Sequence, residues 1–104
     1  MDKITSRAQL TTAIQSHHSF ILIFSAIWSG ISESTRRNFE RVGAKYPTLY
    51  QAWISTDDNP ELAGDLNVSS IPAEIGFKGG VEVVRYIGPK ISDAEVEEFI
   101  REVL

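Results

Sequence analysis

Hydrophobic and polar positions along the first part of the chain predict a helix and then a buried strand. Between Ser6 and Ser16 the apolar residues recur at helical spacing, and Ser6 with Gln9 has the form of a capping box. The run Phe20–Phe24 is unbroken, β-branched and aromatic, which is typical of a strand buried on both faces. We therefore expect a short helix followed by the central strand of a sheet.

The next part of the chain predicts a second strand between two helices. Apolar residues recur among charged ones after position 31, which indicates a long amphipathic helix that ends before Pro47. The segment Tyr50–Ile54 has strand character, and Asn59 followed by Pro60 predicts a capped short helix. A helical crossover of this kind implies that the two strands are parallel.

The last part of the chain predicts a hairpin and a final helix. Ala73–Lys78 and Val81–Ile87 have strand patterns, and Gly79-Gly80 between them is a two-residue hairpin signal. Ser92–Glu95 is a second capping box and opens an amphipathic helix. The expected order is α β α β α β β α, an α/β fold in which a mixed sheet is flanked by helices. Every connection is short enough for one domain over residues 1–104.

Composition and charge restrict the classes of partner. The chain has 104 residues, 42% of them hydrophobic, and a net charge of −4 without a long basic run, so we expect no nucleic-acid partner. Phe20–Phe24 is too short to span a bilayer, and the charges within Met1–Arg7 do not suit a secretory signal. We expect a cytoplasmic protein with no membrane partner. The sequence contains no cysteine, which excludes disulfides and thiolate metal sites.

Two motifs, read together, suggest a family. The segment Trp28-Ser29-Gly30-Ile31-Ser32 lies between the buried strand and the long helix, and Val68–Pro72 opens the hairpin. This arrangement resembles the thioredoxin family, with serines in both cysteine positions and with Ile71-Pro72 matching the isoleucine and cis-proline. Further matches in spacing are Asp57–Pro60, Phe77–Gly80 and Gly88. The resemblance covers essentially the whole chain and implies a thioredoxin fold with helices on both sheet faces.

The activity that the resemblance implies is protein-disulfide reduction. In the family, a cysteine at a helix start is stabilised as a thiolate, and a second cysteine one turn later resolves the mixed disulfide. Ser29 and Ser32 occupy these catalytic positions, but a hydroxyl cannot form a disulfide, so the exchange pathway is closed. The resemblance implies no cofactor and no metal. For a cysteine-containing parent, it implies disulfide-bearing protein substrates and a thioredoxin reductase.

Two further departures concern proton transfer. The buried acid that the family carries on the central strand falls at Ile23, and the lysine that faces it falls at Trp53. An experimenter who makes a redox-dead variant substitutes both cysteines and leaves this pair alone, which favours natural loss of activity. Divergent thioredoxin-like proteins, however, sometimes keep the cysteines without the pair. Both origins, an engineered double-serine variant and natural loss, therefore stay open.

A second function is possible on the same scaffold. The resemblance implies a shallow apolar groove beside the loop that holds an extended peptide, formed by Trp28, Gly30, Ile31, Ile71, Pro72 and Gly88. A chain that keeps this groove without the cysteines would be a non-catalytic module that recognises a partner protein.

Other polar residues have simpler interpretations. Arg36-Arg37 is expected on a solvated helix face, and Asp57-Asp58 in turn and cap roles, since this pair lacks the ligand spacing of a calcium loop. The adjacent histidines His17 and His18 point in different directions and are not expected to bind a metal. Trp53 is expected in the core.

Overall fold

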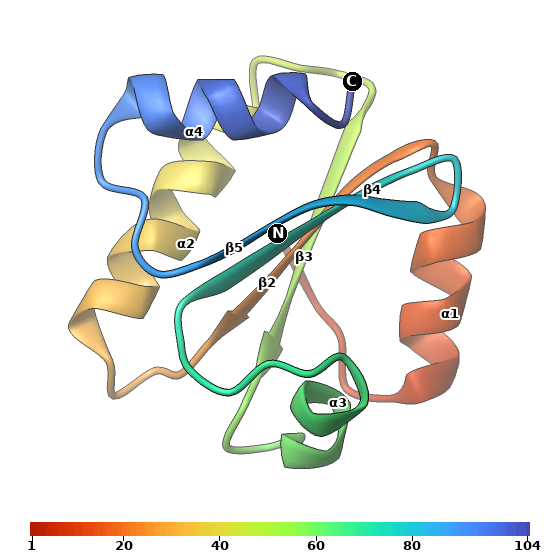
Figure 1. Ribbon diagram of the computed structural model, residues 1–104, viewed down its shortest axis with the longest axis vertical. Helices are drawn as coiled ribbons and strands as arrows, with labels where there is room; N and C mark the ends of the chain where they lie inside the picture. The colour runs from red at the N-terminus through yellow and green to blue at the C-terminus, as the bar shows by residue number, and fades with distance from the viewer.

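The computed structural model describes residues 1–104 as five strands and four helices (Figure 1). In chain order the elements are β1 (Asp2–Lys3), α1 (Arg7–Ser16), β2 (Ser19–Ser25), α2 (Gly30–Gly43), β3 (Leu49–Ser55), α3 (Pro60–Asp65), β4 (Ala73–Lys78), β5 (Val81–Ile87) and α4 (Asp93–Arg101). This order confirms the expected elements and adds the two-residue strand β1 at the start of the chain.

The sheet has the strand order β1-β3-β2-β4-β5, so β2 lies at its centre. Strand β2 pairs with β3 in parallel and with β4 in antiparallel orientation, and β4 pairs with β5 in antiparallel orientation. The expected parallel crossover and C-terminal hairpin are therefore confirmed. Every residue of β2 is buried, as its unbroken apolar run predicts.

Helices cover both faces of the sheet and divide the core into two layers (Figure 1). On one face, α1 and α3 pack against side chains such as Phe20, Leu22 and Ile75. On the other face, α2 and α4 pack against Ile21, Ile23 and Trp53. Because successive side chains of a strand point to opposite faces, Ile23 and its neighbours Phe24 and Leu22 belong to different layers.

Local signals explain most element boundaries. Gly79 and Gly80 have φ values of 60° and 82°, which the two-residue hairpin turn requires and glycine adopts without strain. At the start of α4, Ser92 and Glu95 form both hydrogen bonds of the predicted capping box. Helix α2 ends at Gly43, a few residues before Pro47.

Two predicted caps are only partly correct. Ser6 accepts a hydrogen bond from the backbone N–H of Gln9, but the side chain of Gln9 binds Thr5 instead of returning to Ser6. Asn59 precedes α3 as expected, yet its side chain makes no cap hydrogen bond and donates to the carbonyl of Thr5 at 3.0 Å. In both cases the side chain forms a hydrogen bond with Thr5 and not the predicted capping hydrogen bond.

No helix of the chain combines the length and the apolar composition that a membrane span needs.

Candidate functional site

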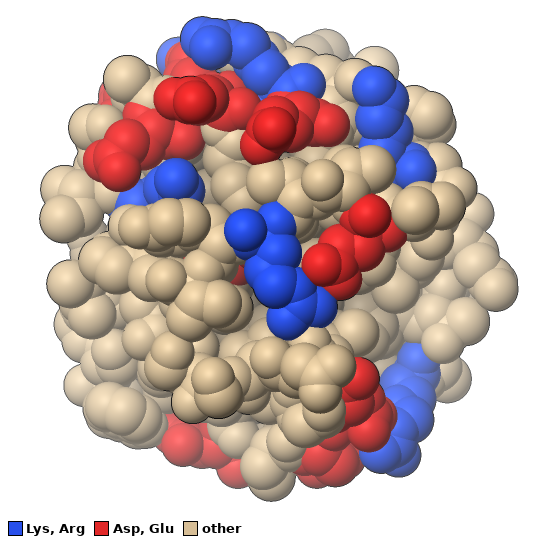
Figure 2. All heavy atoms as spheres, viewed as in Figure 1, with Lys and Arg blue, Asp and Glu red and all other residues tan.

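The loop after β2 presents apolar side chains to solvent at the start of α2. Ile27, Trp28 and Ile31 have exposed fractions of 77%, 70% and 52%. In the view of Figure 2, the lower left of the molecule, over the start of α2 and the loops near it, is almost free of charged side chains. Exposed apolar side chains that gather in this way are of the kind that proteins use to contact other molecules.

Ser29 is the N-cap of α2. Its side chain accepts a hydrogen bond from the backbone N–H of Ser32 at 3.4 Å, and its own backbone N–H donates to the carbonyl of Ala26 at 3.0 Å. A group at this position lies at the positive end of the helix dipole, beside N–H groups that have no partner within the helix. The position would stabilise a thiolate, but here it holds a hydroxyl that caps the helix.

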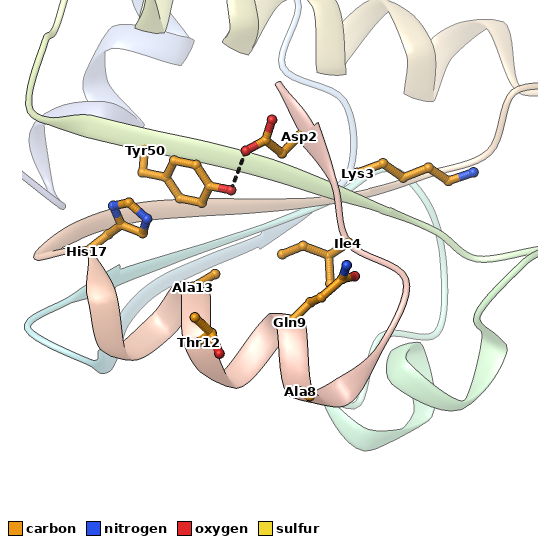
Figure 3. Close-up of a pocket in the computed structure, with 9 residues that line it drawn as sticks. All are labelled: Asp2, Lys3, Ile4, Ala8, Gln9, Thr12, Ala13, His17 and Tyr50. Carbon is orange, nitrogen blue, oxygen red and sulfur yellow. Dashed lines mark hydrogen bonds between the residues drawn. The ribbon is translucent and has the colours of Figure 1, made fainter.

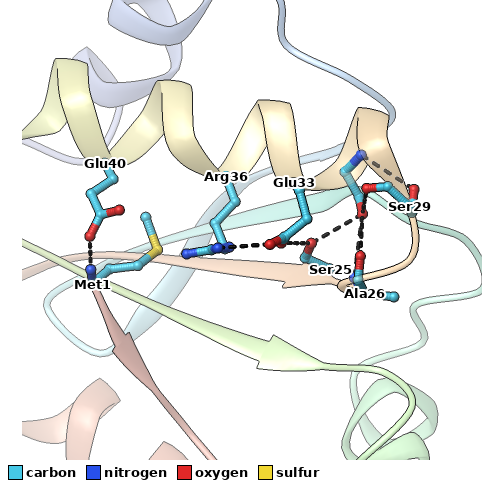
Figure 4. Close-up of polar contacts among 8 residues, drawn as sticks. Met1, Ser25, Ala26, Ser29, Glu33, Arg36 and Glu40 are labelled. Carbon is cyan, nitrogen blue, oxygen red and sulfur yellow. Dashed lines mark hydrogen bonds and ion pairs between the residues drawn. The ribbon is translucent and has the colours of Figure 1, made fainter.

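Ser32 is fully buried, and its hydroxyl lies among several polar partners (Figure 4). Its Oγ is 3.0 Å from Oγ of Ser25, 3.3 Å from both the carbonyl oxygen and the amide nitrogen of Ala26, and 3.2 Å from the carbonyl of Ser29. These contacts link the end of β2, the loop and the first turn of α2 through one oxygen atom. The serine at position 32 is therefore part of the structure of the loop.

Glu33 and Arg36 extend this network beneath α2. Arg36 donates from Nε and Nη2 to the two carboxylate oxygens of Glu33 at 2.9 and 2.8 Å, and Ser25 Oγ lies 2.7 Å from Oε2 of Glu33. The hydrogen bonds from Arg36, assisted by the one from Ser25, lower the pKa of Glu33 to about 2. Its carboxylate therefore stays ionised at neutral pH.

The expectation that Arg36 is solvated is wrong. Its side chain has an exposed fraction of 17%, and the guanidinium lies 4.6 Å from the ring centre of Trp53 as a cation–π contact. Arg37, its neighbour, is exposed as expected. Helical geometry explains the difference, because position 36 lies on the same side of α2 as the buried Phe39.

The positions of the missing acid and lysine lie side by side in the sheet. Ile23 on β2 pairs with Trp53 on β3, and both side chains are buried in the layer under α2 and α4. This layer nevertheless holds acidic groups that sequence reasoning missed. Glu33 lies on its α2 side, and Glu74 of β4 pairs with Ile23 from the other side.

Glu74 has no solvent exposure, and neither carboxyl oxygen has a hydrogen-bond partner. Burial raises the pKa of this carboxyl to about 8, against a weak opposing effect of the Lys90 charge. The carboxyl is therefore protonated and uncharged at neutral pH. The strand pattern does not predict the burial of Glu74, because a single glutamate in an alternating strand normally faces solvent.

The second predicted segment lies next to the loop. Ile71 is half-buried and Pro72 buried, the peptide bond between them is cis, and Gly88 donates its N–H to the carbonyl of Pro72 at 2.8 Å. Trp28 and Ile71 line one small hollow of about 210 Å³, whose floor includes Ala63 and Val68. The structure thus brings Trp28 and Ile71 together, whereas Ile31 lies outside this hollow.

Asp57 holds the exposed indole in place. The Nε1 hydrogen of Trp28 is donated to the Asp57 carboxylate at 2.6 Å, a contact that sequence reasoning did not predict. Asp58 accepts from Lys3 at 2.7 Å, and its backbone N–H donates to the Ser55 hydroxyl at 3.3 Å, which is compatible with the expected turn role.

A larger hollow of about 560 Å³ lies between α1 and the start of β3 (Figure 3). Tyr50 donates its hydroxyl to Asp2 at 2.8 Å, and the ring of His17 stacks on Tyr50 with centres 3.9 Å apart. His18 is exposed and does not line this hollow. Tyr50 and Asp2 thus pair with each other inside the hollow, while Lys3 and Gln9 of its lining bind Asp58 and Thr5.

Comparison with known proteins finds thioredoxins among the relatives of this chain. The chain is 32% identical over 98 residues to a thioredoxin of Chlamydia trachomatis, covering 93% of this chain and 94% of that one. It is 32% identical over 97 residues to a thioredoxin of Mycobacterium tuberculosis, covering 92% and 84% of the two chains. A bifunctional thioredoxin reductase/thioredoxin of Mycobacterium leprae is 29% identical over 89 residues, covering 85% of this chain and 19% of that longer protein. No family profile matches the chain.

Solved structures agree on the fold. The structure of Fasciola hepatica thioredoxin superposes with a TM-score of 0.88 over 100% of both chains, at 24% identity. That of Plasmodium falciparum thioredoxin gives the same TM-score at 21% identity. The five-stranded mixed sheet, the loop after its central strand and these likenesses define a thioredoxin fold, with hydroxyls in the sulfur positions of the loop. The chain belongs to the thioredoxin family.

Proposed function

We propose that this chain is a thioredoxin-like binding module that holds an extended, apolar segment of a partner protein without exchanging disulfides. The observation that carries the proposal is the pair of serines, each with a structural role. Ser29 caps α2, and Ser32 joins the loop to β2 through hydrogen bonds that its hydroxyl makes while fully buried. A hydroxyl at either position cannot form a mixed disulfide, so binding is not followed by electron transfer.

The surface around the loop supports an apolar ligand. Trp28 and Ile31 are exposed, and Ile71, which precedes the buried Pro72, lines the hollow beside the indole. The hydrogen bond from Trp28 to Asp57 orients the ring before a partner arrives, which lowers the entropy lost on binding. In this assignment Trp28, Ile31, Ile71 and Pro72 contact the partner, and Gly30 and Gly88 allow its backbone to approach.

Titration with a thiol-free probe tests the proposal. Carbamidomethylated insulin B chain is extended and apolar and cannot take part in exchange. We expect it to shift the indole N–H resonance of exposed Trp28 in a saturable way and to leave that of Trp53, which is 8% exposed, almost unchanged. In Trp28→Ala, which lacks the reporter indole, binding is followed by isothermal titration calorimetry and should be at least about tenfold weaker, as expected for an aromatic anchor.

A matched control comes from the edge strand. Val83 on β5 is also apolar and is 48% exposed, so Val83→Ala removes a similar kind of surface away from the loop. Its binding constant should equal that of the unsubstituted chain. Equal weakening by both substitutions, or no saturable shift at Trp28, would overturn the assignment of the groove.

A redox-active parent with cysteines at 29 and 32 is the second candidate. The position of Ser29 at the start of α2 favours it, because the helix end that would stabilise a thiolate is retained. Such a parent would act on protein disulfides and be recharged by a thioredoxin reductase, an activity that the M. leprae relative carries in its name. The coding sequence separates the two: cysteine codons at 29 and 32 would support the redox-active parent, and serine codons would favour the binding module.

We also propose that residues 1–104 act as one thioredoxin-like domain in the cytoplasm. The match to 94% of the C. trachomatis thioredoxin supports the first part. Fractionation of cells that carry the tagged protein tests the second.

A further inference from the structure

The carboxylate of Glu33 reaches the side chain at position 32 through a single hydroxyl. Ser25 Oγ lies 2.7 Å from Oε2 of Glu33 and 3.0 Å from Oγ of Ser32 (Figure 4). A serine hydroxyl carries one proton, and an ionised carboxylate can only accept. The Ser25 hydroxyl therefore donates its proton to Glu33, and its oxygen can act only as an acceptor toward Ser32.

The carboxylate is itself held in place. Arg36 binds both of its oxygens and lies against the ring of Trp53, while the Glu33 side chain has an exposed fraction of only 11%. Arg37 adds a weaker favourable charge effect. A bidentate pair in this setting has little freedom to turn away from Ser25.

We propose that Glu33 is a positioning residue which, through Ser25, makes position 32 a site for an uncharged hydrogen-bond donor. The inference rests on the proposed function and deepens it, since it states why a hydroxyl suits this position in a module that does no chemistry. The Ser32 hydroxyl can donate to the Ser25 oxygen or to the carbonyls of Ala26 and Ser29, and an anion at position 32 would meet these oxygens and, behind Ser25, a fixed negative charge. The first turn of α2, and with it Ile31, is held by this arrangement.

A single thiol placed at position 32 reports on the proposal directly. In Ser32→Cys, Ser29 stays a hydroxyl, so no disulfide can form within the chain. We expect the pKa of the introduced thiol, measured from the ultraviolet absorbance of the thiolate, to lie above the ordinary value of about 8.5. A group that only filled space at position 33 would not influence this pKa.

Substitution of the carboxylate gives the decisive comparison. Adding Glu33→Gln to Ser32→Cys should raise the thiolate-to-thiol ratio at a given pH about tenfold or more, because a nearby negative charge is lost. Adding Ser25→Ala, which leaves the ion pair intact, should move the ratio in the same direction by less. Glu40→Gln is the matched control, since Glu40 is an exposed carboxylate on the same helix and should leave the ratio unchanged.

The outcomes are distinct. An unchanged thiol pKa in both the Glu33→Gln and the Ser25→Ala backgrounds, or an equal change with Glu40→Gln, overturns the inference. If Glu33→Gln does not fold, Ser25→Ala decides alone. Failure of the B-chain titration with the unsubstituted protein would remove the proposed binding function and leave this thiol measurement unaffected, so the two can be told apart.

Discussion

Glu33 and Glu74 are both buried on the α2 and α4 side of the sheet, yet their surroundings differ in every other respect. Glu33 accepts hydrogen bonds from Arg36 and Ser25, and both of its oxygens are in use. Glu74 accepts none, although it is completely buried. The pKa of Glu33 is lowered to about 2, and that of Glu74 is raised to about 8.

The difference shows that partners, and not burial alone, determine the charge of a buried carboxyl. Around Glu33 the protein supplies a cation and a hydroxyl, which offset the cost of removing the charge from water. Around Glu74 the pairing residues are Ile23 and Tyr86, and the ammonium of Lys90 lies over the Tyr86 ring at 3.9 Å. Neutralisation by a proton is the remaining way to keep Glu74 buried.

The largest expected effect concerns Glu74 and the pH range from 4.5 to about 8. Its folded-state pKa of about 8 exceeds the ordinary 4.5, so the unfolded chain releases this proton first, and stability falls as pH rises from 4.5 to about 8. The loss of stability over this range is on the order of 5 kcal/mol. Glu74→Gln, which cannot ionise, should remove that decline, as measured by urea unfolding at several pH values.

Glu74→Leu sharpens the result. It should also remove the pH dependence, and it should raise stability at pH 7 by on the order of 1–3 kcal/mol, because an unpaired buried polar group is replaced by an apolar one of similar size. A decline between pH 4.5 and 8 that persists unchanged in both variants would show that Glu74 is solvated or paired in solution.

Glu33 should give a smaller effect on the opposite limb of the pH curve. Its folded-state pKa of about 2 lies below the ordinary 4.5, so its stabilisation is present above pH 4.5 and is lost as pH falls toward 2. Glu33→Gln should lower stability at pH 7 by about 2 kcal/mol, the usual size for hydrogen bonds to a charged group, and should flatten the acid limb. Equal acid limbs in the two proteins would contradict this account of the network.

The smallest effect is expected at a surface ion pair of similar geometry. Arg41 binds Asp93 with two hydrogen bonds at 2.7 and 3.1 Å, but both side chains are more than half exposed. Solvent and salt screen such a pair, so Arg41→Ala should leave the unfolding midpoint within experimental error. A loss as large as that of Glu33→Gln would mean that pairing geometry, and not burial, sets the strength of both pairs.

Most of the fold could be predicted from local patterns. The buried run of β2, the Gly79-Gly80 turn and the Ser92 capping box each carry their own physical signal, and each is confirmed. Strand β1 was missed because two residues are too few for a pattern, and its pairing with β3 is a tertiary contact. The predicted side-chain cap at Asn59 is wrong for a similar reason, because this side chain makes a tertiary hydrogen bond to the carbonyl of Thr5.

The buried carboxyl groups could not be predicted in the same way. Charged residues on an amphipathic helix are normally solvated, so the residue types of Glu33 and Arg36 predict exposure. The structure instead places both side chains largely out of solvent. The spacing from Ser32 to Arg36 to Phe39 places all three on one side of α2, which was a usable signal. For Glu74 no such signal exists, because its burial depends on how α2 and α4 cover the sheet.

We infer that this member of the thioredoxin family keeps the loop geometry of the family and has no exchange chemistry. The rate of insulin disulfide reduction by dithiothreitol, measured with the chain and with its Ser29→Cys/Ser32→Cys variant, tests it most directly. The chain should leave the rate at the level of dithiothreitol alone, and the double variant should accelerate it, because sulfur then lies at the start of α2. Acceleration by the unsubstituted chain, or none by a folded double variant, would contradict it.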